Sequence, residues 1–130
     1  MTQQWPACPI ETMLLLISEK WKVLILRDLL DGTKRFGQLK ASVTGISQKV
    51  LTSNLRSMEA AGLLTRTVYA EVPPRVEYTL TDIGYSLKPV LDAMLAWGEA
   101  YKKQVPTPPA ALLEKHGAGE CPTSKSSRRT

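Results

Sequence analysis

The sequence is poor in the residues from which metal sites, disulfide frameworks and catalytic dyads are built. Its 130 residues include one histidine and two cysteines, Cys8 and Cys121, which lie far apart in the chain. A single histidine supplies no set of metal ligands, and two distant cysteines form no disulfide framework. No glycine-rich phosphate loop is present. We therefore expect no catalytic residues, no metal and no cofactor, and the sequence does not indicate an enzyme.

Long apolar runs are also missing. No stretch approaches the roughly 18 apolar residues that a membrane-spanning helix needs. The apolar segment MLLLI, residues 13–17, is short and is followed by Ser18, Glu19 and Lys20. It lacks the basic flank and the small-residue cleavage site of a signal peptide. We expect a cytoplasmic protein with no membrane partner, in which one domain surrounds one hydrophobic core.

Acidic residues are scarce in the middle third of the chain. Residues 34–75 contain seven basic side chains and two acidic ones, whereas residues 1–33 and 76–103 each carry a net charge of −1. The net charge of +5 is therefore concentrated between residues 34 and 75. A localised basic region favours a polyanionic partner. A basic face that is merely solvated is the alternative that composition leaves open.

The pattern of apolar residues predicts a mainly helical domain with a small β-hairpin. Cys8 and Pro9 suit the N-cap and first position of a helix, and a change to Val, Tyr and Thr marks two strands. The expected helices span residues 9–18, 18–32, 35–43 and about 47–61, the strands 63–72 and 75–80, and a last helix, kinked at Pro89, about 82–103. Residues 1–8 form an arm, 9–103 the domain, and 104–130 a tail expected to be mostly disordered.

The helix expected at about 47–61 has an unusual polar face. Leu51, Leu55 and Met58 follow the spacing of a buried stripe. No acidic residue precedes Glu59 in this helix. The polar face consists instead of hydroxyls, an amide and cations: Ser47, Gln48, Lys49, Thr52, Ser53 and Arg56. These are the side chains that read base edges and bind phosphates in DNA complexes.

The order of the elements explains this face. A winged helix-turn-helix has this order: three helices, a helix with a polar N-terminal half, and then a hairpin. The helix that follows the turn enters the major groove. We expect Lys34, Arg35 and Lys40 to bind phosphate, and Arg75, near the hairpin tip, to reach a minor groove or a phosphate. The alternative is a polar helix in a small helical domain whose hairpin only packs.

The sequence resembles the HxlR family of bacterial transcription regulators, which are relatives of the MarR type. The matching stretches cover roughly residues 8–103: CPIE, EKWKVLILRDLLDGTKRFGQLK, GISQKVLTSNLRSMEAAGLL, VPPRVEYTLTDIGYSL and VLDAMLAWG. The resemblance implies a homodimer in which the first and last helices pack against their mates. The apolar excess of the last helix fits such an interface, with the candidate residues Leu87, Leu91, Met94, Trp97 and Tyr101. Intramolecular packing on the second helix is the alternative.

A cysteine just before the first helix is also a family feature, and here it is Cys8. In several members of the family this cysteine senses electrophiles or oxidants. The positive end of a helix dipole favours the thiolate that such chemistry needs. A cysteine that only caps and packs is the alternative.

The first functional hypothesis is a repressor that binds a palindromic operator as a homodimer and is switched at Cys8 by oxidation or a small electrophile. A regulator gated by an unidentified effector without redox sensing is a second possibility. A protein-docking module on the same scaffold is a third, but docking surfaces favour exposed apolar anchors over a face such as Gln48, Lys49 and Arg56.

Overall fold

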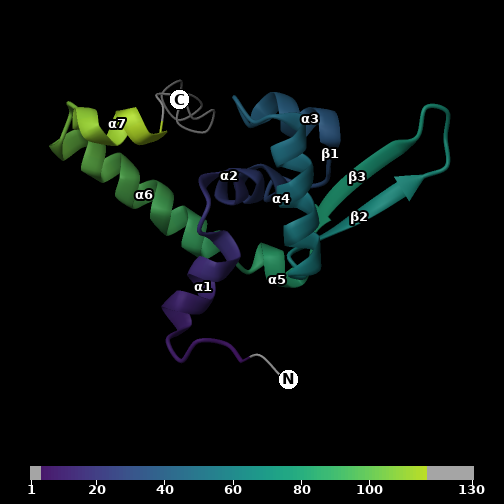
Figure 1. Cartoon of the computed structure of the whole chain (residues 1–130), viewed down its shortest axis with the longest axis horizontal. Helices are drawn as coiled ribbons and strands as arrows, with labels where there is room; N and C mark the ends of the chain where they lie inside the picture. The colour runs from purple at the N-terminus through teal and green to yellow at the C-terminus, as the bar shows by residue number, and fades with distance from the viewer. Residues whose placement is uncertain (1–3, 117–130) are drawn as a thin grey trace. The chain divides into compact units, whose positions relative to one another are not determined.

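The computed structural model describes residues 4–116 of the chain. These residues divide into two compact units, residues 4–86 and 87–116. The first unit contains α1 (Pro9–Ile17), α2 (Lys20–Leu29), β1 (Lys34–Arg35), α3 (Phe36–Ser42), α4 (Gln48–Ala60), β2 (Leu64–Tyr69), β3 (Arg75–Leu80) and α5 (Asp82–Tyr85) (Figure 1). The second contains α6 (Lys88–Gln104) and α7 (Ala110–His116).

The core of the first unit forms where α2 packs against α3, α4 and β3. Ile25, Leu26 and Leu29 of α2 are completely buried. Leu51, Leu55 and Met58 of α4 cover the other side of the same core. Figure 1 shows α4 crossing α2, with the β2–β3 hairpin extending away from this cluster. The predicted fold class, mainly helical with a small sheet, is confirmed.

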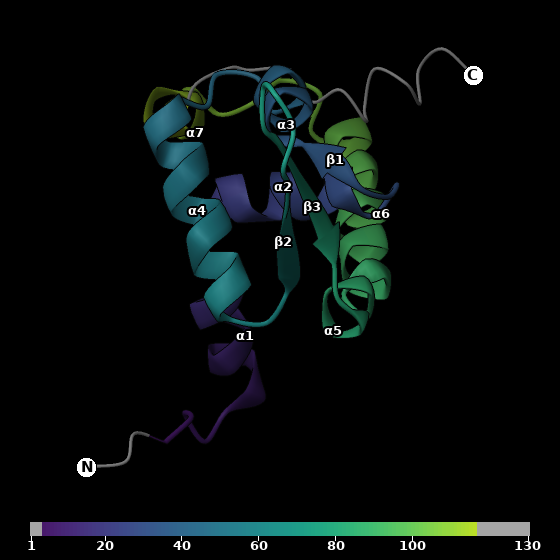
Figure 2. The same ribbon diagram turned by 90° about the vertical axis from the view of Figure 1, so that its right-hand side faces the viewer.

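The sheet contains one strand that the sequence did not predict. Its strand order is β1-β3-β2 and all pairs are antiparallel. Lys34 of β1 pairs with Tyr78 and Arg35 pairs with Glu77. Two residues are too few to show the alternation from which strands are predicted, and Arg35 was expected to begin the third helix. Figure 2 shows the sheet standing beside α4 with α2 behind it (Figure 2). Below, the β2–β3 hairpin, residues 64–80, is called the wing.

A tight turn sets the angle between α3 and α4. Val43 and Ile46 are buried under the turn, and Gly45 adopts a φ of 90° that favours glycine. The Ser47 hydroxyl then accepts a hydrogen bond of 3.1 Å from the backbone N–H of Val50, which makes Ser47 the N-cap of α4.

The junction between the wing and α5 is closely packed. The Thr81 hydroxyl donates to the Gly62 carbonyl at 2.6 Å and accepts from the Gly84 N–H at 3.1 Å. Gly84 lies directly against the backbone after α4, where an added Cβ would be 2.2 Å from the Leu63 carbonyl oxygen. The backbone φ of Gly84 is one that any residue can adopt. Glycine is required at this position because a side chain would collide with the Leu63 carbonyl.

Gly84→Ala is expected to lower the free energy of unfolding by about 2–3 kcal/mol, because the new methyl group meets a backbone carbonyl that cannot rotate away. Gly37→Ala in α3 is the matched control, because an added Cβ there has no neighbour within 4 Å. It should be neutral or stabilising by up to about 1 kcal/mol. Urea unfolding of both variants at one protein concentration measures the difference. Equal stability of the two variants would contradict the packing at Gly84.

The predicted last helix is interrupted. Instead of one kinked helix from about 82, the chain forms α5 and then α6, which begins at Lys88 with Pro89 in its first turn. Proline lacks an N–H and clashes with the preceding turn, so it is accommodated at a helix start more easily than in an interior. Within residues 104–130, which were expected to be mostly disordered, Ala110–His116 forms the helix α7. Residues 117–130 lie outside the described range.

Candidate nucleic-acid interface

The polar side chains of α4 are exposed together. Gln48, Lys49, Thr52, Ser53 and Arg56 line one open groove of about 600 Å³ along the helix. Ser47 is exposed at its N-terminal end while its hydroxyl caps the helix. The first turn of α4 contains no acidic residue. The structure thus brings five of the six residues predicted for this helix together on one face, and places the sixth, Ser47, at its N-terminal end.

The rotation of α4 about its axis is fixed by what it buries. The polar residue Asn54 is only 5% exposed, and its Nδ2 donates to the Val50 carbonyl of the same helix at 2.9 Å. Asn54 is therefore on the inner side with Leu51 and Leu55. The opposite side, which carries Lys49 and Arg56, is left to solvent.

The cations that precede α4 lie on two elements. Lys34 is half-buried on β1, Arg35 is exposed at the N-terminus of α3, and Lys40 is exposed on α3. The backbone N–H of Arg35 donates to the Gln38 side chain at 2.8 Å, which fixes the start of α3. Phe36, the next residue, lines a second cavity together with α4 residues. The β1–α3 junction therefore lies beside the exposed face of α4.

Arg75 is held within the wing rather than free at its tip. Its Nη2 is 3.3 Å from Glu71 Oε2, its Nε is 3.6 Å from Glu77 Oε2, and its guanidinium lies 4.0 Å from the centre of the Tyr69 ring. Its side chain is 30% exposed. These contacts join both strands and the loop between them, so Arg75 fixes the shape of the wing.

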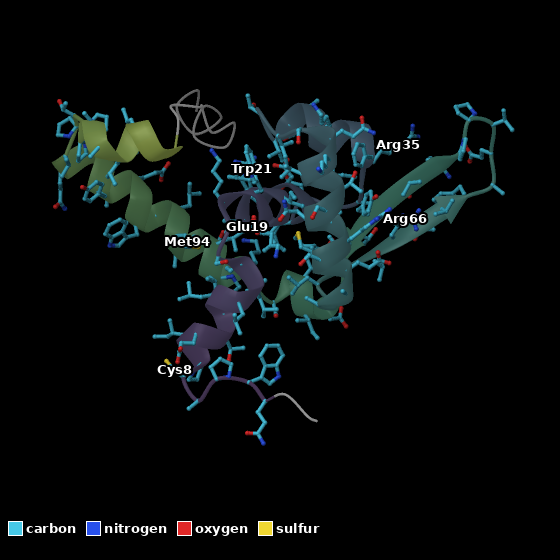
Figure 3. All side chains as sticks on the ribbon, in the orientation of Figure 1. Cys8, Glu19, Trp21, Arg35, Arg66 and Met94 are labelled. Carbon is cyan, nitrogen blue, oxygen red and sulfur yellow. The ribbon has the colours of Figure 1, made fainter. Side chains whose placement is uncertain are left out.

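Arg66 on β2 was missed by the sequence reasoning. It lines the second cavity with Gln48, Thr52 and Arg56 of α4, and Figure 3 shows its side chain where the wing meets that helix (Figure 3). The available signal was strand alternation, since Arg66 follows the buried Leu64 by two residues and shares its side of the strand. A cation on that side is placed toward α4.

Cys8 occupies the predicted position before the first helix. It is the N-cap residue of α1, with extended backbone angles, and Pro9 follows at the first helical position. Its thiol is free and exposed. Cys121 lies outside the described residues. No group of histidine, cysteine, aspartate and glutamate in the described part of the chain could hold a metal ion.

The residues predicted for the dimer interface lie on α6, from its N-cap Leu87 to Tyr101 near its C-terminal end. Leu91 is buried and Leu87 is half-buried, but Met94, Trp97 and Tyr101 are exposed. The rings of Trp97 and Tyr101 stack with their centroids 5.3 Å apart. Met94 and Trp97 also line an open apolar groove of about 700 Å³ on this helix. Within residues 4–116, no helix has the length and apolar character needed to cross a bilayer.

A helix-turn-helix whose second helix exposes polar and basic side chains, with no acidic residue before Glu59, and which is followed by a wing defines a winged helix-turn-helix DNA-binding protein. The comparison with known families agrees. The model of the HxlR-like helix-turn-helix matches residues 16–106, and the chain belongs to this family. The protein is accordingly a DNA-binding transcriptional regulator of the HxlR and MarR type and not an enzyme.

The relatives cover similar shares of the chain. The HTH-type transcriptional regulator YdeP of Bacillus subtilis, itself uncharacterized, is 43% identical over 104 residues, which are 80% of this chain and 81% of YdeP. The redox regulator HypR in its reduced form is 41% identical, covers 75% of this chain and 96% of its own, and has a TM-score of 0.71. The quinone-bound YodB of B. subtilis is 34% identical over 72% of this chain and 99% of its own, with a TM-score of 0.62.

Proposed function

We propose that two copies of this chain form a homodimer that binds a palindromic operator, with one α4 in each of two successive major grooves. The observation that carries this proposal is the exposed face of α4, which has no acidic residue before Glu59 and offers Gln48 to base edges and Arg56 to a base edge or a phosphate. Thr52 and Ser53 contact bases or phosphates. A two-fold dimer presents its reading helices symmetrically, and symmetry in the protein requires symmetry in the operator.

The phosphate contacts are assigned by charge and by position beside α4. Lys34, Arg35 and Lys40 lie on the elements beside α4 and bind the DNA backbone. Arg75 contributes mainly by holding the wing, because a phosphate could reach it only in exchange for Glu71 or Glu77. With DNA as the partner, the protein acts in the cytoplasm.

The exposed apolar residues of α6 support the dimer. Trp97 is 68% exposed and Met94 is 47% exposed, and exposed aromatic and methionine side chains that lie together mark an interface. Ile10 and Leu14 of α1 are also exposed, so the first helix supplies further apolar area for a mate. Repression requires only that the bound dimer exclude polymerase from a promoter, whereas activation requires a further contact, and we therefore assign repression.

Cys8 is assigned the role of the switch. The support is its exposed thiol at the N-cap of α1, and the likeness to HypR, solved in oxidized and reduced forms, and to YodB, solved with quinone bound. Cys8 lies at the start of α1, which we assign to the dimer interface. Oxidation or alkylation of its thiol changes how the two copies pack against each other. The distance between the two reading helices then no longer matches the operator.

A mobility shift with the full chain tests this function. Reduced protein is expected to shift one fragment from upstream of its own gene or a neighbouring gene, and to lose affinity by orders of magnitude between roughly 50 and 200 mM salt. Treatment with diamide or a quinone should abolish the shift, and Cys8→Ser should bind equally before and after treatment. Loss of binding in both proteins would exclude Cys8 as the switch. Absence of any shift at low salt would refute DNA binding itself.

A further inference from the structure

A small cavity lies between α4 and the wing, and it shares three lining residues with the open groove along α4. Its volume is about 230 Å³, well above the roughly 30 Å³ that one water molecule occupies in the liquid. Gln48, Thr52 and Arg56 line it from α4, and Arg66 and Tyr78 line it from the wing. Glu59 is the acidic residue among the lining side chains. The cavity therefore carries two guanidinium groups and one carboxylate.

The register of the wing directs Arg66 into this cavity. Arg66 pairs with Tyr78 across the two strands, as Leu64 pairs with Leu80. Directly paired residues share one face of an antiparallel sheet, and Tyr78 is buried on the face toward the core. Arg66 thus extends that face outward, beyond the buried residues and beside α4.

Arg75 belongs to the opposite face of the wing. Successive residues of a strand alternate between faces, so Arg75 and Glu77 lie on the side away from Val76 and Tyr78. Arg75 already has two carboxylate neighbours there. It is therefore not available to the cavity or to a ligand in it.

Arg66 and Arg56 are both exposed, and neither forms an ion pair or side-chain hydrogen bond with any of residues 4–116. Two unpaired guanidinium groups on one cavity repel each other, and the repulsion is relieved when an anion lies between them. The planar fork of arginine matches the oxygens of a phosphate in a two-bond arrangement. Duplex DNA supplies such phosphates along its whole length.

We propose that Arg66 is a further DNA-contacting residue, which with Arg56 holds one backbone phosphate at the mouth of this cavity. The wing then contributes to affinity through the base of β2, where it meets α4. The proposal rests on the proposed function, in which α4 lies in the major groove. A phosphate held by both elements fixes the depth of α4 in the groove, so that Gln48 and Thr52 reach the base edges.

The test is the salt dependence of binding to a fluorescent duplex of random sequence, followed by anisotropy with the full chain. Arg66→Gln is expected to bind about tenfold more weakly and to reduce the slope of log affinity against log salt by about 0.9 per bound chain. Arg66→Lys should keep the wild-type slope because it keeps the charge. Lys88→Gln is the control for net charge, since it removes a cation that is paired with Asp92 on α6, and it should leave slope and affinity unchanged.

A second variant at the same cavity is expected to raise the affinity for DNA instead of lowering it. Glu59→Gln removes the carboxylate that faces the phosphate and should tighten binding roughly twofold or more. Matching thermal unfolding midpoints show that each variant is folded. An Arg66→Gln slope equal to that of the wild type, or weaker binding by Glu59→Gln, would overturn the proposal while DNA binding stands. If the wild type shows no salt-dependent binding, the proposed function and this inference fail together.

Discussion

Arg56→Glu is expected to reduce the affinity for duplex DNA by at least about a hundredfold at about 100 mM salt. A well-formed arginine contact contributes about 1–3 kcal/mol, and a dimer loses two of them. The new carboxylates are also repelled by the phosphates they face. Arg56 is exposed and has no partner in the described part of the chain, so the fold should be unaffected. Anisotropy titration of the purified variant measures the loss.

Two controls separate charge from geometry in this experiment. Arg56→Lys keeps the positive charge but loses the planar guanidinium that forms two parallel hydrogen bonds. It should bind DNA more weakly than the wild type, with nearly the same slope of log affinity against log salt. Lys88→Glu applies the same charge reversal on α6 and should retain most of the affinity. A folded Arg56→Glu protein that binds as well as the wild type would show that the exposed face of α4 is turned away from the DNA.

The reading face was predictable from sequence because a helix is a local structure. The period of 3.6 residues requires only the order of the side chains. It placed Leu51, Leu55 and Met58 inside, and left Gln48 and Arg56 outside. The hydroxyl of Ser47 likewise needs only the N–H three residues later to become a cap.

The roles of the wing arginines could not be read from sequence, because they depend on pairing between distant residues. Arg75 follows the two prolines of the loop, and nothing in the neighbouring sequence indicates which residues it pairs with. Its engagement by Glu71 and Glu77 follows from the path of the loop and the strand. The position of Arg66 beside α4 follows from its pairing with Tyr78, twelve residues further along the chain. A hairpin of unknown register leaves both faces open.

The break between α5 and α6 shows a similar limit. Proline inside a helical pattern predicts either a kink or an end, and the apolar spacing on both sides of Pro89 favoured a continuous helix. The structure ends α5 at Tyr85 and begins α6 at Lys88. What decides between the two outcomes is the packing of Gly84 against the Leu63 carbonyl, which holds α5 in place and is a contact between distant parts of the chain.

If the protein forms the homodimer proposed above, Trp97→Glu is expected to convert it to monomers and thereby to remove most of the operator affinity. A carboxylate buried in an apolar interface without a partner is strongly unfavourable, and the two-fold axis places it there twice. The dissociation constant of the dimer should rise by at least about a hundredfold. Because each monomer then binds one half-site alone, the affinity for a complete operator should fall by about 10²- to 10⁴-fold. Sedimentation equilibrium gives the mass and anisotropy gives the affinity.

A matched control for Trp97→Glu is available at Lys88 on the same helix, α6. Lys88 precedes Trp97 by nine residues, which at 3.6 residues per turn places it on the opposite side of α6. Lys88→Glu should therefore remain dimeric, and Trp97→Phe, which keeps an apolar ring, should also remain largely dimeric. A dimeric Trp97→Glu protein with normal DNA binding would show that Met94 and Trp97 lie outside the interface. A monomeric protein with undiminished affinity would show that one copy of α4 is enough, and would remove the reason for a palindromic operator.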